Sequence, residues 1–149
     1  MPDKLPILDA HMHVAGIGYG GTGCYVHPKT LNSLPFHFLR AFLGFTRKDT
    51  LERLDELVLE RILAVIREAP SITHGLIYAH DAIIDRDGTR NETLTQLCVP
   101  NEYVLKLARE YEELLPAVSI HPHRKDALDR LHECIEAGAL ALKCLPNSQ

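Results

Sequence analysis

His11 and His13 are the residues of this chain best suited to chemistry, because they lie two positions apart at the end of an apolar segment. Residues two apart in an extended strand point to the same side, so both imidazole rings face one way. Two neutral imidazoles on one face can bind a divalent metal ion. A pair of hydrogen-bonded histidines would give the same pattern, and the spacing alone does not separate the two interpretations.

The strand that carries this pair, predicted over residues 5–14, has two different faces. One face is apolar throughout: Leu8, Ala10, Met12 and Val14. The other becomes polar toward the end of the strand: Ile7, Asp9, His11 and His13. Such a strand suits the inner wall of a parallel barrel, in which helices cover the apolar face and active sites form at the C-terminal ends of the strands.

Hydrophobic periodicity predicts strands that alternate with helices. The expected strands are residues 5–14, 72–83, 115–121 and 139–145, and the three main helices begin near Asp49, Asn101 and Lys125. The first helix begins with Asp49 and Glu52 at capping-box spacing and ends at Pro70, and residues 85–88 form a turn. Asn101 is the expected N-cap of the second helix, and Gly138 ends the third. The alternation predicts an α/β fold with a parallel sheet, as an open doubly wound sheet or a TIM-like barrel.

The later strands also end in residues capable of chemistry. His80 and Asp81 follow the second strand, His121 ends the third, and Lys143 lies in the fourth on a face of small residues. Each residue alone is better explained as part of the core or rim. Their convergence on one mouth predicts a site, because barrel active sites draw residues from the ends of several strands. His80, Asp81 and His121 are thus candidate substrate-binding residues, and the pattern does not decide whether His80 or Asp81 points inward.

Composition limits the classes of function. The 149 residues include 46% hydrophobic and 24% charged residues, with a net charge of -4. This predicts a globular protein without the clustered Lys and Arg of a nucleic-acid surface. The four cysteines form no C-x-x-C pair, which argues against a zinc ribbon and a disulfide framework. No apolar run approaches the roughly 20 residues that span a bilayer, and no signal segment is recognisable, so a cytoplasmic protein without membrane contact is expected.

Residues 16–21 match the pattern G-x-G-x-x-G and follow a strand. Dinucleotide binding also needs a helix that opens on the last glycine, and an acidic residue about 20 positions further on. Neither is present, because the chain continues through Thr22 to Pro28 and residues 37–48 contain no acid. We therefore predict no nucleotide site, and interpret residues 15–48 as a Gly-rich insertion that forms a flexible loop over the barrel mouth.

Three segments together resemble the amidohydrolase superfamily of metal-dependent TIM-barrel hydrolases, in particular its amidohydrolase-2-like branch. They are Ile7-Leu-Asp-Ala-His11-Met-His13, Val118-Ser-Ile-His121-Pro122 and Ala141-Leu-Lys143-Cys-Leu-Pro146. The resemblance implies that His11 and His13 bind a divalent metal, usually zinc, which activates water for hydrolysis of a C–N or C–O bond in a small molecule. Lys143 would be a carboxylated metal-bridging residue or would bind a substrate carboxylate. Some relatives are metal-dependent decarboxylases of aromatic acids.

The resemblance extends over only about the first half of the family's barrel. The family's remaining ligands are histidines after the fifth and sixth strands and an aspartate after the eighth. We therefore expect one partial TIM-barrel domain over residues 1–149, either a fragment or half of a two-chain assembly, and a poor catalyst alone. Its exposed sheet edge invites self-association. The alternative is a non-catalytic half-barrel that acts only after assembly.

Overall fold

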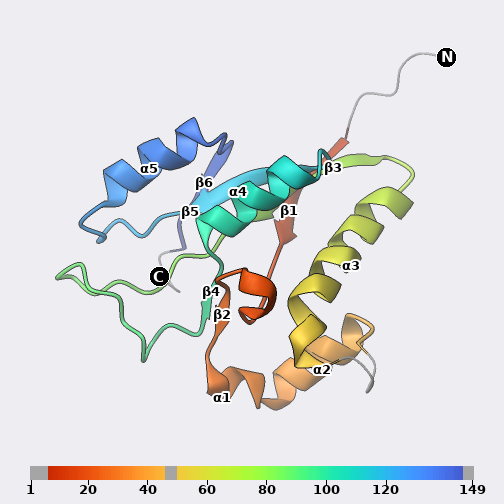
Figure 1. The fold of residues 1–149 in the computed structure, drawn as a ribbon, viewed down its shortest axis with the longest axis horizontal. Helices are drawn as coiled ribbons and strands as arrows, with labels where there is room; N and C mark the ends of the chain where they lie inside the picture. Colours follow the sequence, from red (N-terminus) through yellow and green to blue (C-terminus); the bar gives the residue numbers. More distant parts are fainter. Residues whose placement is uncertain (1–6, 46–49, 146–149) are drawn as a thin grey trace.

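Four apolar segments form one parallel sheet in a computed structural model that describes residues 7–45 and 50–145 (Figure 1). The strands are β1 (Ile7–His13), β3 (Ile72–Tyr78), β5 (Leu114–Ser119) and β6 (Ala141–Lys143), in that spatial order. The sheet curls through 201°, slightly more than half of a closed circle. This confirms the expected half of a TIM-like barrel and excludes the open doubly wound sheet.

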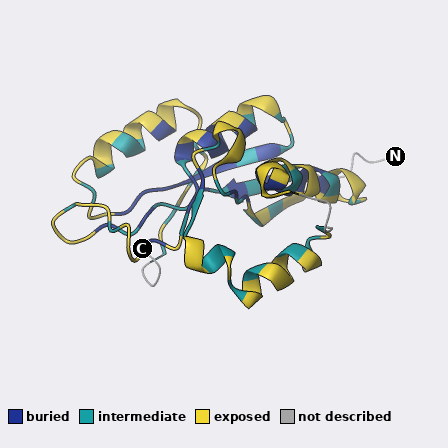
Figure 2. Cartoon of the chain, turned by 60° about the horizontal axis from the view of Figure 1, so that its bottom comes forward, coloured by how far each residue is buried: buried dark blue, intermediate teal, exposed yellow. Residues whose placement is uncertain are grey.

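Each connection between successive strands of this sheet contains one main helix that packs against it. The helices are α3 (Leu54–Glu68), α4 (Asn101–Glu110) and α5 (Ala127–Glu136). Figure 2 shows that buried residues gather on the inner strands, β3 and β5, and on the helix sides turned toward them, while the outer sides of the helices are exposed. The helices thus cover one face of the sheet, as the apolar periodicity predicts.

The core lies between these helices and the sheet. Its central strand, β5, is buried along almost its whole length, which fits a parallel strand with neighbours on both sides. Met12 and Val14 of the first strand segment pack into the same core, on the predicted apolar face. The main cluster includes Val14, Val58, Ile62, Ile66, Ile77, Val104, Leu107 and Leu114.

The insertion between β1 and α3 contains several short elements. They are the 3-10 helices η1 (Tyr19–Gly21) and η2 (Leu51–Arg53), the helices α1 (Pro28–Leu31) and α2 (Leu34–Phe42), and the strand β2 (Tyr25–Val26). β2 pairs antiparallel with β4 (Leu97–Cys98), which belongs to the long segment after β3. The insertion is therefore tied to another part of the chain by a second, small sheet.

The Gly-rich segment is anchored by Asp55, a buried residue in the first turn of α3. The Asp55 carboxylate accepts hydrogen bonds from the backbone N–H groups of Ile17 and Gly18, at 2.6 and 3.0 Å, and from the Thr22 hydroxyl, at 2.5 Å. A Cβ atom at position 16 would overlap this carboxylate, so the close approach requires Gly16. Within the segment predicted as a flexible loop, the N–H groups of Ile17 and Gly18 thus bind a carboxylate of the protein itself.

Several element boundaries differ from the predicted ones, and β6 covers only Ala141–Lys143 of the predicted residues 139–145. β3 ends at Tyr78, not near residue 83, because the backbone of His80 turns to pair with Val99 at 2.9 and 2.8 Å. Asn101 is the first residue of α4 and does not cap it, because its amide side chain bonds to the backbone of Ser119. The predicted cap Asp49 lies outside the described residues, among which α3 begins at Leu54.

Other local predictions are confirmed. α3 ends at Glu68, shortly before Pro70. The turn at residues 85–88 is closed by a hydrogen bond from Gly88 N–H to the Asp85 carbonyl, at 2.9 Å. Gly138 follows α5 with a positive φ of 99°, the conformation that glycine adopts at the end of a helix.

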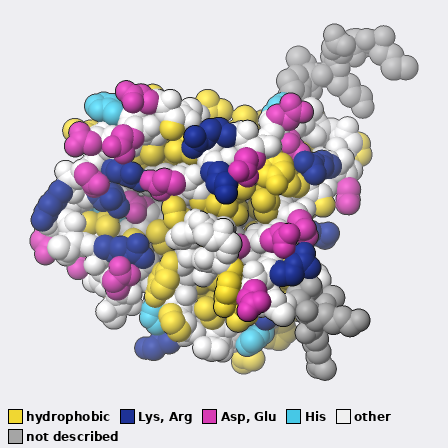
Figure 3. All heavy atoms as spheres, viewed as in Figure 1, with side chains coloured by type: hydrophobic (Ala, Val, Ile, Leu, Met, Phe, Trp, Pro, Cys, Tyr) yellow, Lys and Arg dark blue, Asp and Glu magenta, His cyan; other side chains and the backbone are white. Residues whose placement is uncertain are grey.

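The surface carries mixed charge on the face shown in Figure 3, where Lys and Arg alternate with Asp and Glu. Among the described residues, every helix is too short or too polar to cross a bilayer.

Candidate functional site

His11 and His13 lie side by side at the C-terminal end of β1. Their Nε2 atoms are 2.9 Å apart, and the ring centroids are 4.8 Å apart at an interplanar angle of 69°. The Asp9 carboxylate accepts the backbone N–H of His11 at 3.0 Å, which holds the strand end that carries the first imidazole. Both rings therefore project to one side of the strand, as the spacing predicted.

Tyr78 stands beside both imidazoles, because β3 pairs in parallel with β1 and places Tyr78 in register with His13. The Tyr78 ring centroid is 5.5 Å from that of His11 and 5.9 Å from that of His13. Its hydroxyl donates a hydrogen bond to the Ala10 carbonyl at 2.9 Å. The ring is thus held in place as an aromatic wall next to the histidine pair.

Lys143 reaches the same ring from the other edge of the sheet. Its Nζ atom is 5.5 Å from the centroid of the Tyr78 ring, which is within the range of a cation–π contact. Lys143 belongs to β6, and β5 lies between β6 and β3. The lysine can cross this gap because the sheet is curled and β5 places the small residues Ala117 and Ser119 in register with β6.

His80 is the residue after β3 that joins this group electrostatically. Burial lowers the pKa of His80, and the charges of Lys143 and His13 lower it further, while Asp81 opposes them. Burial also lowers the pKa of His13, with smaller effects of Lys143 and His11. Both imidazoles are therefore neutral near pH 7, the form that binds metals and accepts protons. We call His11, His13, Tyr78, His80 and Lys143 the strand-end cluster.

Lys143 itself is partly buried within the strand-end cluster, and this burial lowers its pKa. Among the described residues, no carboxylate forms an ion pair with its ammonium group. A partly desolvated cation without a counter-ion is an attractive position for an anionic ligand group.

Asp81 and His121 are engaged by the loops that follow β3 and β5. The Asp81 carboxylate accepts the backbone N–H groups of Ala82 and His121, both at 2.8 Å, and contacts Arg124 at 3.3 Å. His121 is only 4% exposed, and its Nδ1 atom accepts the backbone N–H of His123 at 3.1 Å. These contacts give both residues a clear role in joining the two loops.

The histidine pair fits two positions of a metal site. The two Nε2 atoms form a hydrogen bond of 2.9 Å, and two nitrogens bound to one tetrahedral zinc ion at about 2 Å each would lie about 3.3 Å apart, so a small separation of the rings would admit a metal ion. The part of the chain that the structure describes contains no group of three His, Cys, Asp or Glu residues that could hold a metal. Stable zinc sites use three or four protein ligands, so the pair alone is an incomplete site.

Tyr78 is the residue of the strand-end cluster that the sequence did not single out. Its signal was its position two residues before His80, which places both on the same face of an extended chain.

Comparisons with protein-family models, curated proteins and solved structures found no match for this chain. Its function therefore has to be inferred from the strand-end cluster.

Proposed function

We propose that this chain is part of a metal-dependent hydrolase of the amidohydrolase type, in which His11 and His13 bind a divalent metal ion. Zinc is the ion that we expect. The observation that carries the proposal is the placement of two adjacent imidazoles, hydrogen-bonded through their Nε2 atoms at 2.9 Å, at the C-terminal mouth of a parallel half-barrel. Active sites of parallel barrels lie at this end of the strands. The lowered pKa of His13 favours its neutral form, in which one of the two ring nitrogens carries no proton and can bind a metal.

The remaining residues of the strand-end cluster have complementary roles in this proposal. A metal ion bound there would polarise a carbonyl group and lower the pKa of a bound water molecule. Lys143 binds an anionic group of the substrate, such as a carboxylate, because its ammonium lacks a counter-ion among the described residues. Tyr78 provides an aromatic surface against which the substrate can pack. His80, neutral near pH 7, accepts or returns a proton during hydrolysis.

A catalytic assay tests this proposal. The zinc-loaded chain is incubated with p-nitrophenyl esters and anilides with and without a carboxylate. We expect slow hydrolysis that requires zinc, that favours the carboxylate-bearing substrates, and that is lost in His11→Ala and His13→Ala. The matched control is His132→Ala, which removes an exposed imidazole on α5. Hydrolysis that persists in both pair variants, or that does not depend on zinc, would contradict the proposal.

We also propose that the open half-barrel associates with a second copy of this chain through its free sheet edges. Within residues 7–45 and 50–145, β1 and β6 each have a neighbouring strand on one side only, and both expose apolar residues, including Ile7 and Leu142. A second copy would supply four more parallel strands, the number needed for an eight-stranded barrel. Sedimentation over a range of concentrations should show dimers that dissociate in Leu142→Lys. A chain that stays monomeric at every concentration would contradict this proposal.

A further inference from the structure

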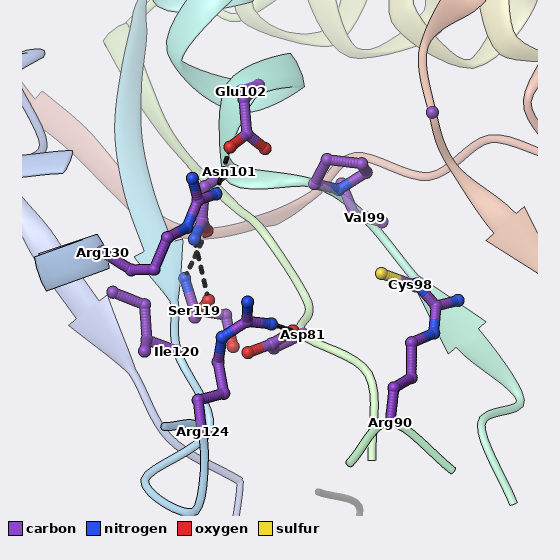
Figure 4. Close-up of a pocket in the computed structure, with 12 residues that line it drawn as sticks. Asp81, Arg90, Cys98, Val99, Asn101, Glu102, Ser119, Ile120, Arg124 and Arg130 are labelled. Atoms are coloured by element: carbon purple, nitrogen blue, oxygen red, sulfur yellow. Dashed lines mark hydrogen bonds and ion pairs between the residues drawn. The ribbon is translucent and has the colours of Figure 1, made fainter. Parts of the chain in front are cut away.

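A cavity of about 160 Å³ lies where β3 and β5 end and α4 begins (Figure 4). Five of its lining residues carry charge: Asp81, Arg90, Glu102, Arg124 and Arg130. None of the residues of the strand-end cluster lines it. The cavity is therefore a separate feature of the same end of the sheet, and we call it the arginine cavity.

Three guanidinium groups reach the arginine cavity from three segments of the chain. Arg90 comes from the segment between β3 and β4, Arg124 from the loop after β5, and Arg130 from α5. Their side chains are 40%, 27% and 29% exposed. Arginine is the residue best suited to a partly buried anion site, because its planar donors match the oxygens of carboxylates and phosphates.

Most of the carboxylates that form ion pairs with these arginines belong to exposed side chains. Arg90 pairs with Glu92, Arg124 with Asp126, and Arg130 with Glu102 and Glu133. These four carboxylate side chains are 49–66% exposed, so each is more exposed than the arginine it contacts. Exposed ion pairs of this kind contribute little to stability. A better-placed anion can therefore displace the carboxylates at low cost.

Asp81 is the exception, because its side chain is only 11% exposed. Its carboxylate holds the backbone of the loop after β5 and contacts Arg124 at 3.3 Å. Asp81 therefore positions Arg124 and is not a group that a ligand would replace. Five carboxylates thus contact the three guanidinium groups, and an incoming anion has to take the place of the four exposed ones.

Each guanidinium keeps N–H groups beyond those used in these pairs. A guanidinium has five N–H donors. Arg90 uses Nε for Glu92, at 2.9 Å, and Arg130 uses one contact each for Glu102 and Glu133. Pro100, Asn101 and Glu102, at the start of α4, line the same cavity. The guanidinium donors thus belong to residues that line one small cavity.

We propose that the arginine cavity binds a phosphate group, either as free inorganic phosphate or as the phosphoryl end of a small metabolite. A phosphate presents three or four oxygens and up to two negative charges, which matches three guanidinium groups better than a carboxylate does. This proposal does not depend on the hydrolase proposal, because it involves none of the same residues.

A binding experiment with two probes tests this proposal. Inorganic phosphate and glycerol 3-phosphate are titrated into the chain by calorimetry at constant ionic strength, with glycerol as the neutral control. The variants are Arg90→Gln and Arg130→Gln, and the matched control is Arg86→Gln, an exposed arginine of the same turn segment. We expect at least one probe to bind and its affinity to fall tenfold or more in each cavity variant, without change in Arg86→Gln.

The outcomes separate the possible ligands and can overturn the proposal. Tighter binding of glycerol 3-phosphate indicates a phosphorylated metabolite, and tighter binding of phosphate indicates the free ion. Arg130→Lys keeps the charge but not the planar donors, so it should bind more weakly than the wild type. Melting curves in chloride buffer establish that each variant is folded. The proposal would be overturned if the wild type bound neither probe, or if folded Arg90→Gln and Arg130→Gln bound the probe as tightly as the wild type.

Discussion

Lys143 and Tyr78 belong to strands that are separated by β5, yet Lys143 Nζ lies only 5.5 Å from the centroid of the Tyr78 ring. In a flat sheet these strands would lie nearly 10 Å apart, since neighbouring strands are about 4.8 Å apart. The curl of the half-barrel and the long lysine side chain bring the two residues together. The same curl places the Lys143 charge where it acts on His13 and His80.

Removal of the Lys143 charge should raise the pKa of both imidazoles. The positive charge of Lys143 disfavours protonation of His13 and His80, so Lys143→Gln should shift both titrations toward higher pH. Burial remains the largest cause of the lowered pKa values, so the shift will be partial. NMR titration of the histidine ring protons in metal-free protein measures it, with the exposed Lys125→Gln as control. Unchanged or lower pKa values in Lys143→Gln would refute the proposed electrostatic coupling.

Asp55 should be a major determinant of stability. Replacement by alanine leaves the N–H groups of Ile17 and Gly18 and the Thr22 hydroxyl without their acceptor in a partly buried environment. We expect Asp55→Ala to lower the free energy of unfolding by about 2–4 kcal/mol. Urea denaturation measures this loss, and the exposed neighbour Glu56→Ala should change stability by less than about 0.5 kcal/mol. Equal effects of the two substitutions would show that Asp55 does not anchor the segment.

We expect the contact of Asn101 with Ser119, which joins α4 to β5, to contribute to stability. Its side-chain amide accepts the Ser119 N–H at 2.8 Å and donates to the Ser119 carbonyl at 3.0 Å, and the residue is buried. Asn101→Ala removes both partners, and we expect a loss of about 2 kcal/mol. The exposed Lys106→Ala on the same helix serves as the control in chemical denaturation. A loss no larger than that of the control would contradict this assignment.

Glu113 should contribute stability that depends on pH. Its backbone hydrogen bond and the Arg67 guanidinium, 2.6 Å away, lower the pKa of its carboxyl below 4.5 in the folded protein, against some opposition from burial. A lowered folded-state pKa stabilises the protein above the unfolded-state pKa, and this contribution disappears as the pH falls through the folded-state pKa. Glu113→Gln should therefore be less stable than the wild type at neutral pH. Unfolding experiments from neutral pH down to about pH 3 should show this difference shrink, whereas a constant difference would contradict the linkage.

The sequence predicted those features that depend on local pattern and on general rules of topology. Alternating strands and helices require parallel pairing, and the two-residue period of β1 placed Met12 with the core and the histidines on the opposite side. The convergence of His13, His80 and Lys143 follows from the rule that parallel strands end at one edge. The choice between His80 and Asp81 required the structure, because it depends on where β3 ends.

The remaining features depend on contacts between residues far apart in the chain. Asp55 forms a hydrogen bond with Ile17, 38 positions away, and Asn101 forms one with Ser119, 18 positions away. An Asp or Asn residue in a sequence does not indicate which distant backbone group it will bind. The sequence predicted that the amide of Asn101 caps its own helix, but in the structure this amide binds the buried backbone of Ser119 instead. The strands β2 and β4 are two residues each, too short to produce a detectable period.

The most direct test of the proposed metal site is a calorimetric zinc titration of the wild type, His11→Ala, His13→Ala and the surface control His132→Ala. The account predicts saturable zinc binding to the wild type and to His132→Ala, and affinity reduced at least tenfold in each variant of the pair, because each loses one of two adjacent imidazole ligands. Equal zinc binding by all four proteins, or no binding by any of them, would contradict the assignment of His11 and His13 as metal ligands.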